Sequence, residues 1–226
     1  MIKAVILYGS KARSDHDRFS DTDLIGVSNS DEIEKPFDQL GVSLHLYPHE
    51  WLTREAKGGS LFLLHIVTEA VAMFDPFDVL SGLRSDFQYR DSYHADAEIG
   101  SRIVSAVMEL EDREFTPIMR KRYFWGLRTA LMADAAEKRL PKFSAKALES
   151  ASKISGLSLH IQTRTDATLA ECRRFGAQVL ERLGVFQAPV DNEAREENLR
   201  FLFGLGGVGT ATAAEIIYSF KPDLHR

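Results

Sequence analysis

The chain has 226 residues, 44% of them hydrophobic and 27% charged, which is enough apolar material for one large globular domain or two small ones. Its formal net charge of -5 argues against general electrostatic binding of nucleic acid, so nucleic acid is not an expected partner. No run reaches the ~18 apolar residues of a membrane span, and the apolar N-terminus is too short for a signal peptide. We therefore expect a cytoplasmic protein without membrane contact; its oligomeric state is left open.

The first ninety residues predict a mixed α/β domain. Apolar runs with strand character cover residues 2–8, 23–27 and 42–47, and polar, turn-rich segments separate them. Around residues 75–93 the sequence becomes rich in Asp, Ser, Gly and Tyr, and Pro76 is expected to stop a preceding helix. We therefore expect a domain over residues 1–90 and a boundary after it.

The remainder, residues 91–226, predicts an all-α helical bundle. Apolar residues recur at helical spacing from Ile99 to Leu110, and further helices are expected near residues 117–139, 144–155, 166–184, 193–203 and 210–220. We expect helix ends at Pro117, Pro141 and Gly184, and Thr165 or Asp166 is expected to cap the helix that follows it. The predicted fold class is α+β: a small mixed-sheet domain followed by a helical bundle.

Residues 8–27, YGSKARSDHDRFSDTDLIGV, place a Gly-Ser pair after one predicted strand and Asp-Thr-Asp before the next. Side chains alternate along a strand, so Asp21 and Asp23 would lie on one face about 6 to 7 Å apart. Two such carboxylates repel unless a divalent cation such as Mg²⁺ binds them. Gly9 allows close approach of a backbone, and Ser10 with the following amides offers donors to a phosphate. Each pattern alone is typical of a turn or a cap, but together they indicate a phosphate and metal site.

The same residues resemble the DNA polymerase β-like nucleotidyltransferase superfamily. The resemblance rests on an apolar strand, Gly9-Ser10, Ala12-Arg13, Ser20-Asp21-Thr22-Asp23 and a second apolar strand, and it extends over about residues 1–90. The helical remainder is only loosely similar to the C-terminal bundles of bacterial kanamycin-type nucleotidyltransferases. The resemblance implies that Gly9 and Ser10 hold a nucleoside triphosphate and that Asp21 and Asp23 bind Mg²⁺. It also implies a third carboxylate on a later strand.

The expected strand for that carboxylate, in GVSLHLYPHEW, has none. If Val42, Leu44 and Leu46 face the core, the opposite face carries Ser43, His45 and Tyr47. His45 is then a candidate general base or metal ligand, and the plainer interpretation is a half-buried histidine without chemistry. Carboxylates in loops or at a helix start are the alternatives, most simply interpreted as solvated charges: Asp15, Asp17, Asp38 and Glu50.

Four further features of the sequence have both a functional and a plainer interpretation. Lys11 and Arg13 lie beside the phosphate turn and are candidates for neutralising triphosphate charge, or are simply exposed cations. The segment RKRYFWGLR predicts a helix that carries Arg120 and Arg128 on nearly one face, as a lining of a nucleotide cleft or as a solvated basic face. The run GLGGVGTATAAE predicts a helix break capped by Thr210 rather than a dinucleotide site. The single cysteine, Cys172, is expected to be inert.

The leading hypothesis is a Mg²⁺-dependent nucleotidyltransferase that moves a nucleoside monophosphate from a nucleoside triphosphate, ATP by expectation, to an acceptor hydroxyl. The acceptor would be a small hydroxylated molecule or a hydroxyl of a partner protein. The alternative is a nucleotide-binding module that has lost catalysis, which the absent third carboxylate favours. The candidate residues are Asp21, Asp23 and His45 for catalysis, Asp21 and Asp23 for the metal, and Gly9, Ser10, Lys11, Arg13 and Ser20 for the nucleotide.

Overall fold

The structure is a computed structural model that describes residues 1–15, 21–184 and 192–219. The chain divides into two compact units, Met1–Asp91 and Ser92–Arg226. The described residues of the first form a five-stranded mixed sheet and four helices, and those of the second are helical throughout their regular elements. Within the described ranges, no helix combines the length and the apolar character that crossing a membrane requires. The chain is thus a mixed α/β protein, and each unit is described by itself.

The first unit is built around one sheet with the strand order β3-β4-β2-β1-β5. Strands β2 and β4 are parallel, whereas the other neighbouring pairs are antiparallel. Its elements are β1 (Ile2–Tyr8), α1 (Gly9–Ala12), β2 (Thr22–Ser28), β3 (Glu34–Gln39), β4 (Val42–Pro48), α2 (His49–Lys57), α3 (Leu61–Glu69), β5 (Val71–Phe74) and α4 (Val79–Asp86). The three strands expected from the sequence correspond to β1, β2 and β4.

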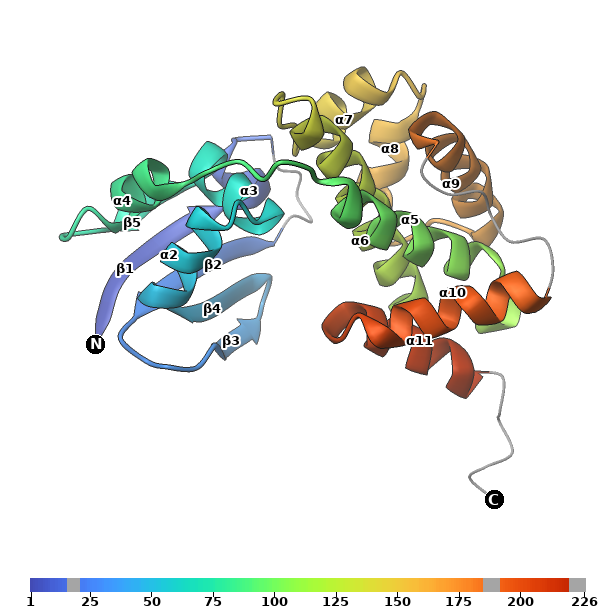
Figure 1. Cartoon of the computed structure of the whole chain (residues 1–226), viewed down its shortest axis with the longest axis horizontal. Coiled ribbons are helices and arrows are strands. Elements are labelled where there is room, and N and C mark those ends of the chain that lie inside the picture. The colour runs from blue at the N-terminus through green and yellow to red at the C-terminus, as the bar shows by residue number, and fades with distance from the viewer. Residues whose placement is uncertain (16–20, 185–191, 220–226) are drawn as a thin grey trace. The chain divides into compact units, whose positions relative to one another are not determined.

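Helices α2, α3 and α4 cover one face of this sheet (Figure 1). Alternate residues of β1 and β2, including Ala4, Ile6, Ile25 and Val27, are buried there against the apolar faces of the helices. Helix α3 begins at Ser60, whose side chain accepts a hydrogen bond from the amide of Leu63. The core of the unit therefore lies on the helix-covered face.

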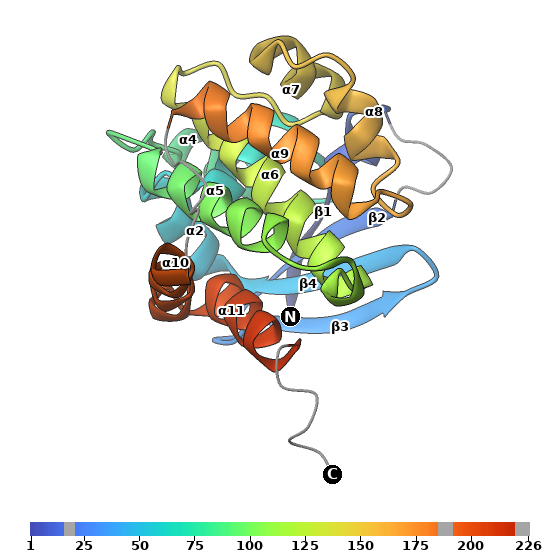
Figure 2. The same ribbon diagram turned by 90° about the vertical axis from the view of Figure 1, so that its right-hand side faces the viewer.

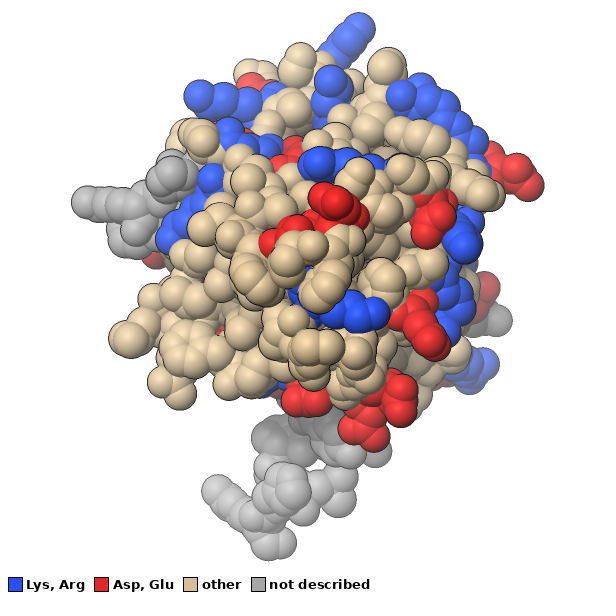
Figure 3. All heavy atoms as spheres, turned by 90° about the vertical axis from the view of Figure 1, so that its left-hand side faces the viewer, with Lys and Arg blue, Asp and Glu red and all other residues tan. Residues whose placement is uncertain are grey.

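The two edges of the sheet differ, and neither was expected from the sequence. Strand β3, with the sequence EKPFDQ, is exposed at every residue, and its charges and proline are typical of a protected edge. Strand β5, VAMF, is uncharged and also exposed throughout. Figure 3, which views the side of the molecule toward which β5 projects, shows a broad area of uncharged atoms among scattered charged groups. Pro76 follows β5, so the expectation that it stops a preceding helix is wrong: α3 ends at Glu69 and a strand intervenes.

The second unit is a bundle in which α5, α6 and α9 lie side by side, while α10 pairs with α11 (Figure 2). Its elements are α5 (His94–Met108), the 3₁₀ turn η1 (Asp112–Glu114), α6 (Pro117–Glu137), α7 (Ala145–Ser152), α8 (Leu157–Gln162), α9 (Leu169–Leu183), α10 (Asn192–Gly204) and α11 (Gly207–Ser219). These bounds agree with the expected helices to within a few residues. The short α8 was not expected.

Helices α5 and α6 pack at unusually close range because each has a glycine at the contact. A Cβ atom built on Gly100 would lie 2.5 Å from the carbonyl oxygen of Gly126 and 2.6 Å from the amide of Ala130. A Cβ built on Gly126 would lie 2.8 Å from the carbonyl oxygen of Gly100. Since backbone atoms cannot move aside as a flexible side chain can, this crossing requires both glycines.

Two expected helix caps are corrected by the structure. Helix α9 begins after Thr168, which accepts from the amide of Glu171 and forms a capping box with its side chain, so the cap is neither Thr165 nor Asp166. Helix α11 begins at Gly207, before Thr210, and the Thr210 hydroxyl donates to the carbonyl oxygen of Phe203 at 2.8 Å. Thr210 therefore satisfies the end of α10 instead of capping α11. The expected break between these helices is present.

Candidate functional site

The Gly9 turn, by which we mean the short helix α1 (Gly9–Ala12) directly after β1, lies against Asp23. Gly9 has a φ of +74°, a backbone conformation that favours glycine. A Cβ atom at this position would lie 2.9 Å from Oδ2 of Asp23, so a side chain there would collide with the carboxylate. Tyr8, which precedes the turn, is the register partner of Asp23 across the β1–β2 pair. The Gly-Ser turn and the second aspartate of Asp-Thr-Asp are therefore neighbours.

Asp21 and Asp23 flank the first residue of β2. Asp23 is half-buried and alternates with Ile25 and Val27, so it points to the helix-covered face at the end of the core. Asp21 is exposed and precedes the strand, and a Cβ atom at Gly41 would lie 3.7 Å from its Oδ1. The Asp23 carboxylate therefore lies beside the core, and the Asp21 carboxylate lies at the exposed start of the strand.

A row of side chains crosses the sheet at the level of Asp23. The strand registers pair Asp23 with Tyr8 on one side and with Ser43 on the other, and they pair Ser43 with Asp38 of β3. The position beside Asp23 on the parallel strand thus holds a serine. Asp38 is two strand spacings away, about 10 Å between main chains, and its largely exposed carboxylate forms an ion pair with Lys35. Asp38 fits the interpretation as a solvated charge.

His45 lies on the same face as Asp23, because it is the register partner of Ile25. Its Nδ1 atom is 3.5 Å from the Ser43 hydroxyl. Burial, followed by the charge of Lys35, lowers the pKa of His45 below its ordinary value, although Asp38 and Asp23 act in the opposite direction. The imidazole is therefore largely neutral near pH 7, a state that can accept a proton.

The expectation that the aliphatic residues of β4 face the core is wrong. Leu44 and Leu46 lie on the opposite sheet face, where a Cβ atom at Gly26 would meet Leu46 at 2.3 Å. The residue that packs against the core is Tyr47, whose ring stacks on Trp51 of α2 with a centroid separation of 5.1 Å. Helices α2, α3 and α4 cover the tyrosine side of the sheet, and that decides which set of side chains is packed in the core of this unit. Ser43 and His45 are therefore on the core side, at the end where the core gives way to polar groups.

The two cations beside the turn have partners within the protein. Lys11 donates to the Thr22 hydroxyl at 2.5 Å. Arg13 donates from Nη1 to Glu69 at 2.7 Å and from Nε to both oxygens of Asp15 at 3.1 Å. A role for either cation in neutralising a triphosphate stays a prediction. Ser10 is half-buried, and its carbonyl oxygen accepts from the Asp15 amide at 3.1 Å. Ser20 and Asp17 lie outside the described residues.

Three residues near the turn were missed by the sequence reasoning: Tyr8, His65 and Glu69. The edge of the Tyr8 ring approaches the His65 ring, with centroids 5.8 Å apart, and burial together with the Asp23 charge raises the Tyr8 pKa well above its ordinary value. His65 Nε2 is 2.7 Å from Oε2 of Glu69, the same oxygen that accepts from Arg13. The available signal was the pattern LFLLHIVTE, in which a histidine and a glutamate four residues apart interrupt an apolar helix.

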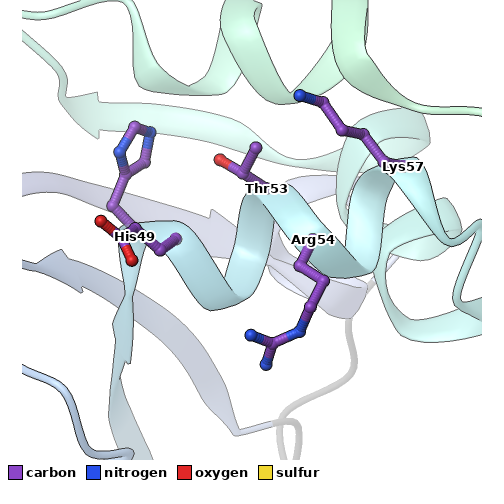
Figure 4. A pocket seen from close by; sticks show the side chains of 5 residues that line it. His49, Thr53, Arg54 and Lys57 are labelled. Atoms are coloured by element: carbon purple, nitrogen blue, oxygen red, sulfur yellow. The ribbon is translucent and has the colours of Figure 1, made fainter.

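A shallow hollow of about 470 Å³ lies elsewhere on the first unit and is formed by α2 alone. Its lining residues are His49, Glu50, Thr53, Arg54 and Lys57. Figure 4 shows that Lys57 and Arg54 extend in opposite directions from the helix, so these cations do not converge on one point. The hollow lacks the converging polar groups of a ligand site.

In helix α6 of the second unit, Arg120 and Arg128 form hydrogen bonds within the protein. Arg120 donates to the carbonyl oxygen of Thr165 at 2.7 Å, and Arg128 donates to that of Phe143 at 3.2 Å. The expectation that this helix lines a nucleotide cleft stays a prediction. Cys172 is buried, and burial raises the pKa of its thiol to about 12, as expected for an inert cysteine.

Within residues 1–15, 21–184 and 192–219, no three histidine, cysteine, aspartate or glutamate side chains gather as a metal-binding group. A Mg²⁺ ion that keeps waters and takes phosphate oxygens needs only one or two protein carboxylates, and Asp23, which borders the side-chain-free space at Gly9, is placed to supply one. Comparison of the chain with known family models and with curated proteins finds no match. The function therefore has to be inferred from the residues of the site.

Proposed function

We propose that the chain is a Mg²⁺-dependent nucleotidyltransferase that moves a nucleoside monophosphate from a nucleoside triphosphate to an acceptor hydroxyl. The observation that carries the proposal is the close approach of the Gly9 turn to Asp23, where a Cβ atom at the positive-φ Gly9 would lie 2.9 Å from the carboxylate. A positive-φ glycine beside a strand-borne carboxylate leaves room for an anionic group next to a metal ligand. ATP is the proposed substrate, and a small hydroxylated molecule or a partner protein is the proposed acceptor.

The residues of the site have separate roles in this proposal. Asp21 and Asp23 would hold Mg²⁺, which when bound supplies positive charge that offsets the charge developing on the phosphate oxygens. Gly9 and Ser10 would contact the triphosphate, with Lys11, Arg13 and Ser20 as further candidates. The acceptor oxygen bonds to the α-phosphorus, the bond from that phosphorus to the β-phosphate oxygen breaks, and pyrophosphate leaves. The hydroxyl proton goes to His45, whose low pKa keeps it unprotonated beforehand.

A second candidate function is nucleotide binding without catalysis. The specific observation in its favour is that Ser43, not a carboxylate, is the neighbour of Asp23 on β4. Without a carboxylate there, activation of the acceptor depends on His45 alone. Such a protein would sense a nucleotide or bind a partner in its presence.

Calorimetric titration with ATP and GTP, with and without Mg²⁺, tests nucleotide binding. We expect binding with Mg²⁺ and at least tenfold weaker binding in EDTA, because Asp21 and Asp23 repel a free triphosphate. Replacement of both by Asn should abolish the metal effect with little loss of stability, since it removes two like charges that lie two residues apart. Asp31→Asn, an exposed residue of the same unit, is the matched control. Equal affinity in EDTA would remove the metal from the proposal.

Incubation with labelled ATP and Mg²⁺ separates the two candidates. The acceptors would be a panel of aminoglycosides, the protein itself and candidate partner proteins. Label on any acceptor that disappears in the Asp23→Asn variant supports transfer. Tight Mg²⁺-dependent binding without label favours the binding module.

A further inference from the structure

The Gly9 turn is tied to α3 at both of its ends. Helix α1 has four residues, too few to be stable in isolation, so other contacts must hold it in place. Before the turn, the Tyr8 ring packs against Phe62 and His65 of α3, with centroids 6.2 and 5.8 Å away. After the turn, Arg13 forms an ion pair with Glu69 in the last turn of the same helix. Helix α3 thus contacts the chain on both sides of the turn.

The Arg13–Glu69 ion pair is the polar contact between α3 and the residue that follows the turn. Its nitrogen–oxygen distance is 2.7 Å, and the two side chains are only 15% and 12% exposed. Oε2 of Glu69 is also 2.7 Å from Nε2 of His65, which lies one helical turn earlier and limits the rotamers that Glu69 can adopt. A largely buried, charge-assisted pair loses more when one partner is removed than an exposed pair does. Glu69 is therefore placed to fix Arg13, and through it the main chain that follows Gly9.

We infer that Glu69 is a positioning residue that holds the Gly9 turn against Asp23 through Arg13. The inference rests on the proposed function in one respect, because the turn is taken to receive the triphosphate. It assigns α3 a part in the site that the sequence motif does not contain. It also gives Arg13 an indirect role: its charge is matched by Glu69 and Asp15, so its main contribution is to hold the turn.

The first test uses the protein without nucleotide. The backbone amides of Arg13, Ser14 and Asp15, which directly follow the turn, donate hydrogen bonds to its carbonyl oxygens at Gly9, Lys11 and Ser10 respectively. Hydrogen exchange at these three amides should become roughly tenfold faster in Glu69→Met and in Arg13→Met. The double variant should exchange about as fast as Arg13→Met alone, since both single changes remove the Arg13–Glu69 pair and Arg13→Met also removes the contact with Asp15. Glu69→Gln, which keeps the side-chain shape, provides the same test if the methionine variants fail to fold.

The control is Glu98→Met in the second unit, which breaks a comparable partly buried pair with Arg102 at 2.9 Å. It should leave exchange at residues 13–15 unchanged. A structural role without positioning would accelerate exchange across the whole first unit equally, and this result would overturn the inference. So would unchanged exchange at residues 13–15 in both single variants.

The second test measures affinity for Mg²⁺-ATP by calorimetry. Loss of the ion pair should weaken binding by about tenfold in Glu69→Met, because the turn must be ordered when the nucleotide binds. If Glu69 instead only withholds Arg13 from the phosphates, the same variant would bind ATP more tightly, and the inference would be overturned. If the unaltered protein binds no nucleotide, the proposed function fails, while the exchange experiment still decides whether Glu69 holds the turn.

Discussion

The two units of the chain differ in where their half-buried and buried polar side chains lie. In the first unit, polar side chains gather at one end of the core face, around Asp23, His45 and the Arg13–Glu69 pair. In the second unit, the buried imidazole of His160 is instead enclosed by aromatic rings, and it stacks on Phe175 with centroids 4.3 Å apart. A polar side chain at the margin of a core can contact a ligand, whereas one that is enclosed by the core affects the stability of the fold. The difference favours the first unit as the place for the proposed chemistry.

The sharpest test of this comparison is His45, for which we expect the largest effect. His45→Ala should reduce nucleotidyl transfer about 10²-fold to 10⁴-fold with nucleotide affinity nearly unchanged, which is the usual contribution of a general base. His49→Ala is the matched control, since His49 is a partly buried histidine of the same unit that contacts Lys3 rather than the site. Equal transfer by the His45 variant and the unaltered protein would show that the histidine has no part in the chemistry.

The close α5–α6 crossing should make the stability of the second unit highly sensitive to a side chain added at Gly100. Gly100→Val should destabilise the protein by about 3 kcal/mol or more, because the new side chain meets backbone atoms of α6. Gly82→Ala on α4 is the control: a Cβ atom there meets nothing within 4 Å, and the change should stabilise by about 0.5 to 1 kcal/mol. Urea denaturation measures both, and similar values for the two variants would contradict the packing argument.

His160 should make folding of the second unit dependent on pH. Burial lowers the pKa of this histidine to about 4, against an ordinary value of 6.5. Between these values the unfolded chain binds the proton and the folded chain does not, so stability falls as the pH drops from about 6.5 toward 4, by up to ~1.4 kcal/mol per pH unit.

The check for His160 is urea denaturation at pH 7.5 and pH 5. His160→Phe should lose most of the difference between the two pH values. His94→Gln, which changes an exposed histidine of the same unit, should keep it. A pH dependence that is the same in all three proteins would show that His160 is not its source.

The smallest expected effect on stability distinguishes two glycines of the first unit. Gly9 and Gly41 have φ values of +74° and +71°, so an alanine at either should cost about 1 to 2 kcal/mol. A Cβ atom approaches Asp23 to 2.9 Å at Gly9 but stays 3.7 Å from Asp21 at Gly41. We therefore expect Gly9→Ala to abolish Mg²⁺-ATP binding and Gly41→Ala to retain it, as measured by calorimetry. Retained binding in both variants would separate the turn from the nucleotide.

The sequence by itself determined the elements that carry a strong local pattern. Apolar alternation marked the three strands that became β1, β2 and β4, and helical spacing with Pro117 and Gly184 marked α6 and α9. The Gly-Ser and Asp-Thr-Asp pairs could be selected as site candidates because their residue types are unusual beside apolar strands. These features depend on neighbours within a few residues, which is the range over which a sequence pattern is informative.

The tertiary structure alone decided the features that depend on distant segments. Strands β3 and β5 exist because β4 and β1 offer unpaired edges, and their own sequences, EKPFDQ and VAMF, carry little strand signal. The face of β4 that is packed was set by helices on one side of the sheet, which reversed the expectation from its aliphatic residues. Glu69 is separated from Arg13 by 56 residues, so its contact with the turn is invisible in the sequence. Long-range pairing brings such groups together only when the chain has folded, because many different pairings satisfy the same local pattern.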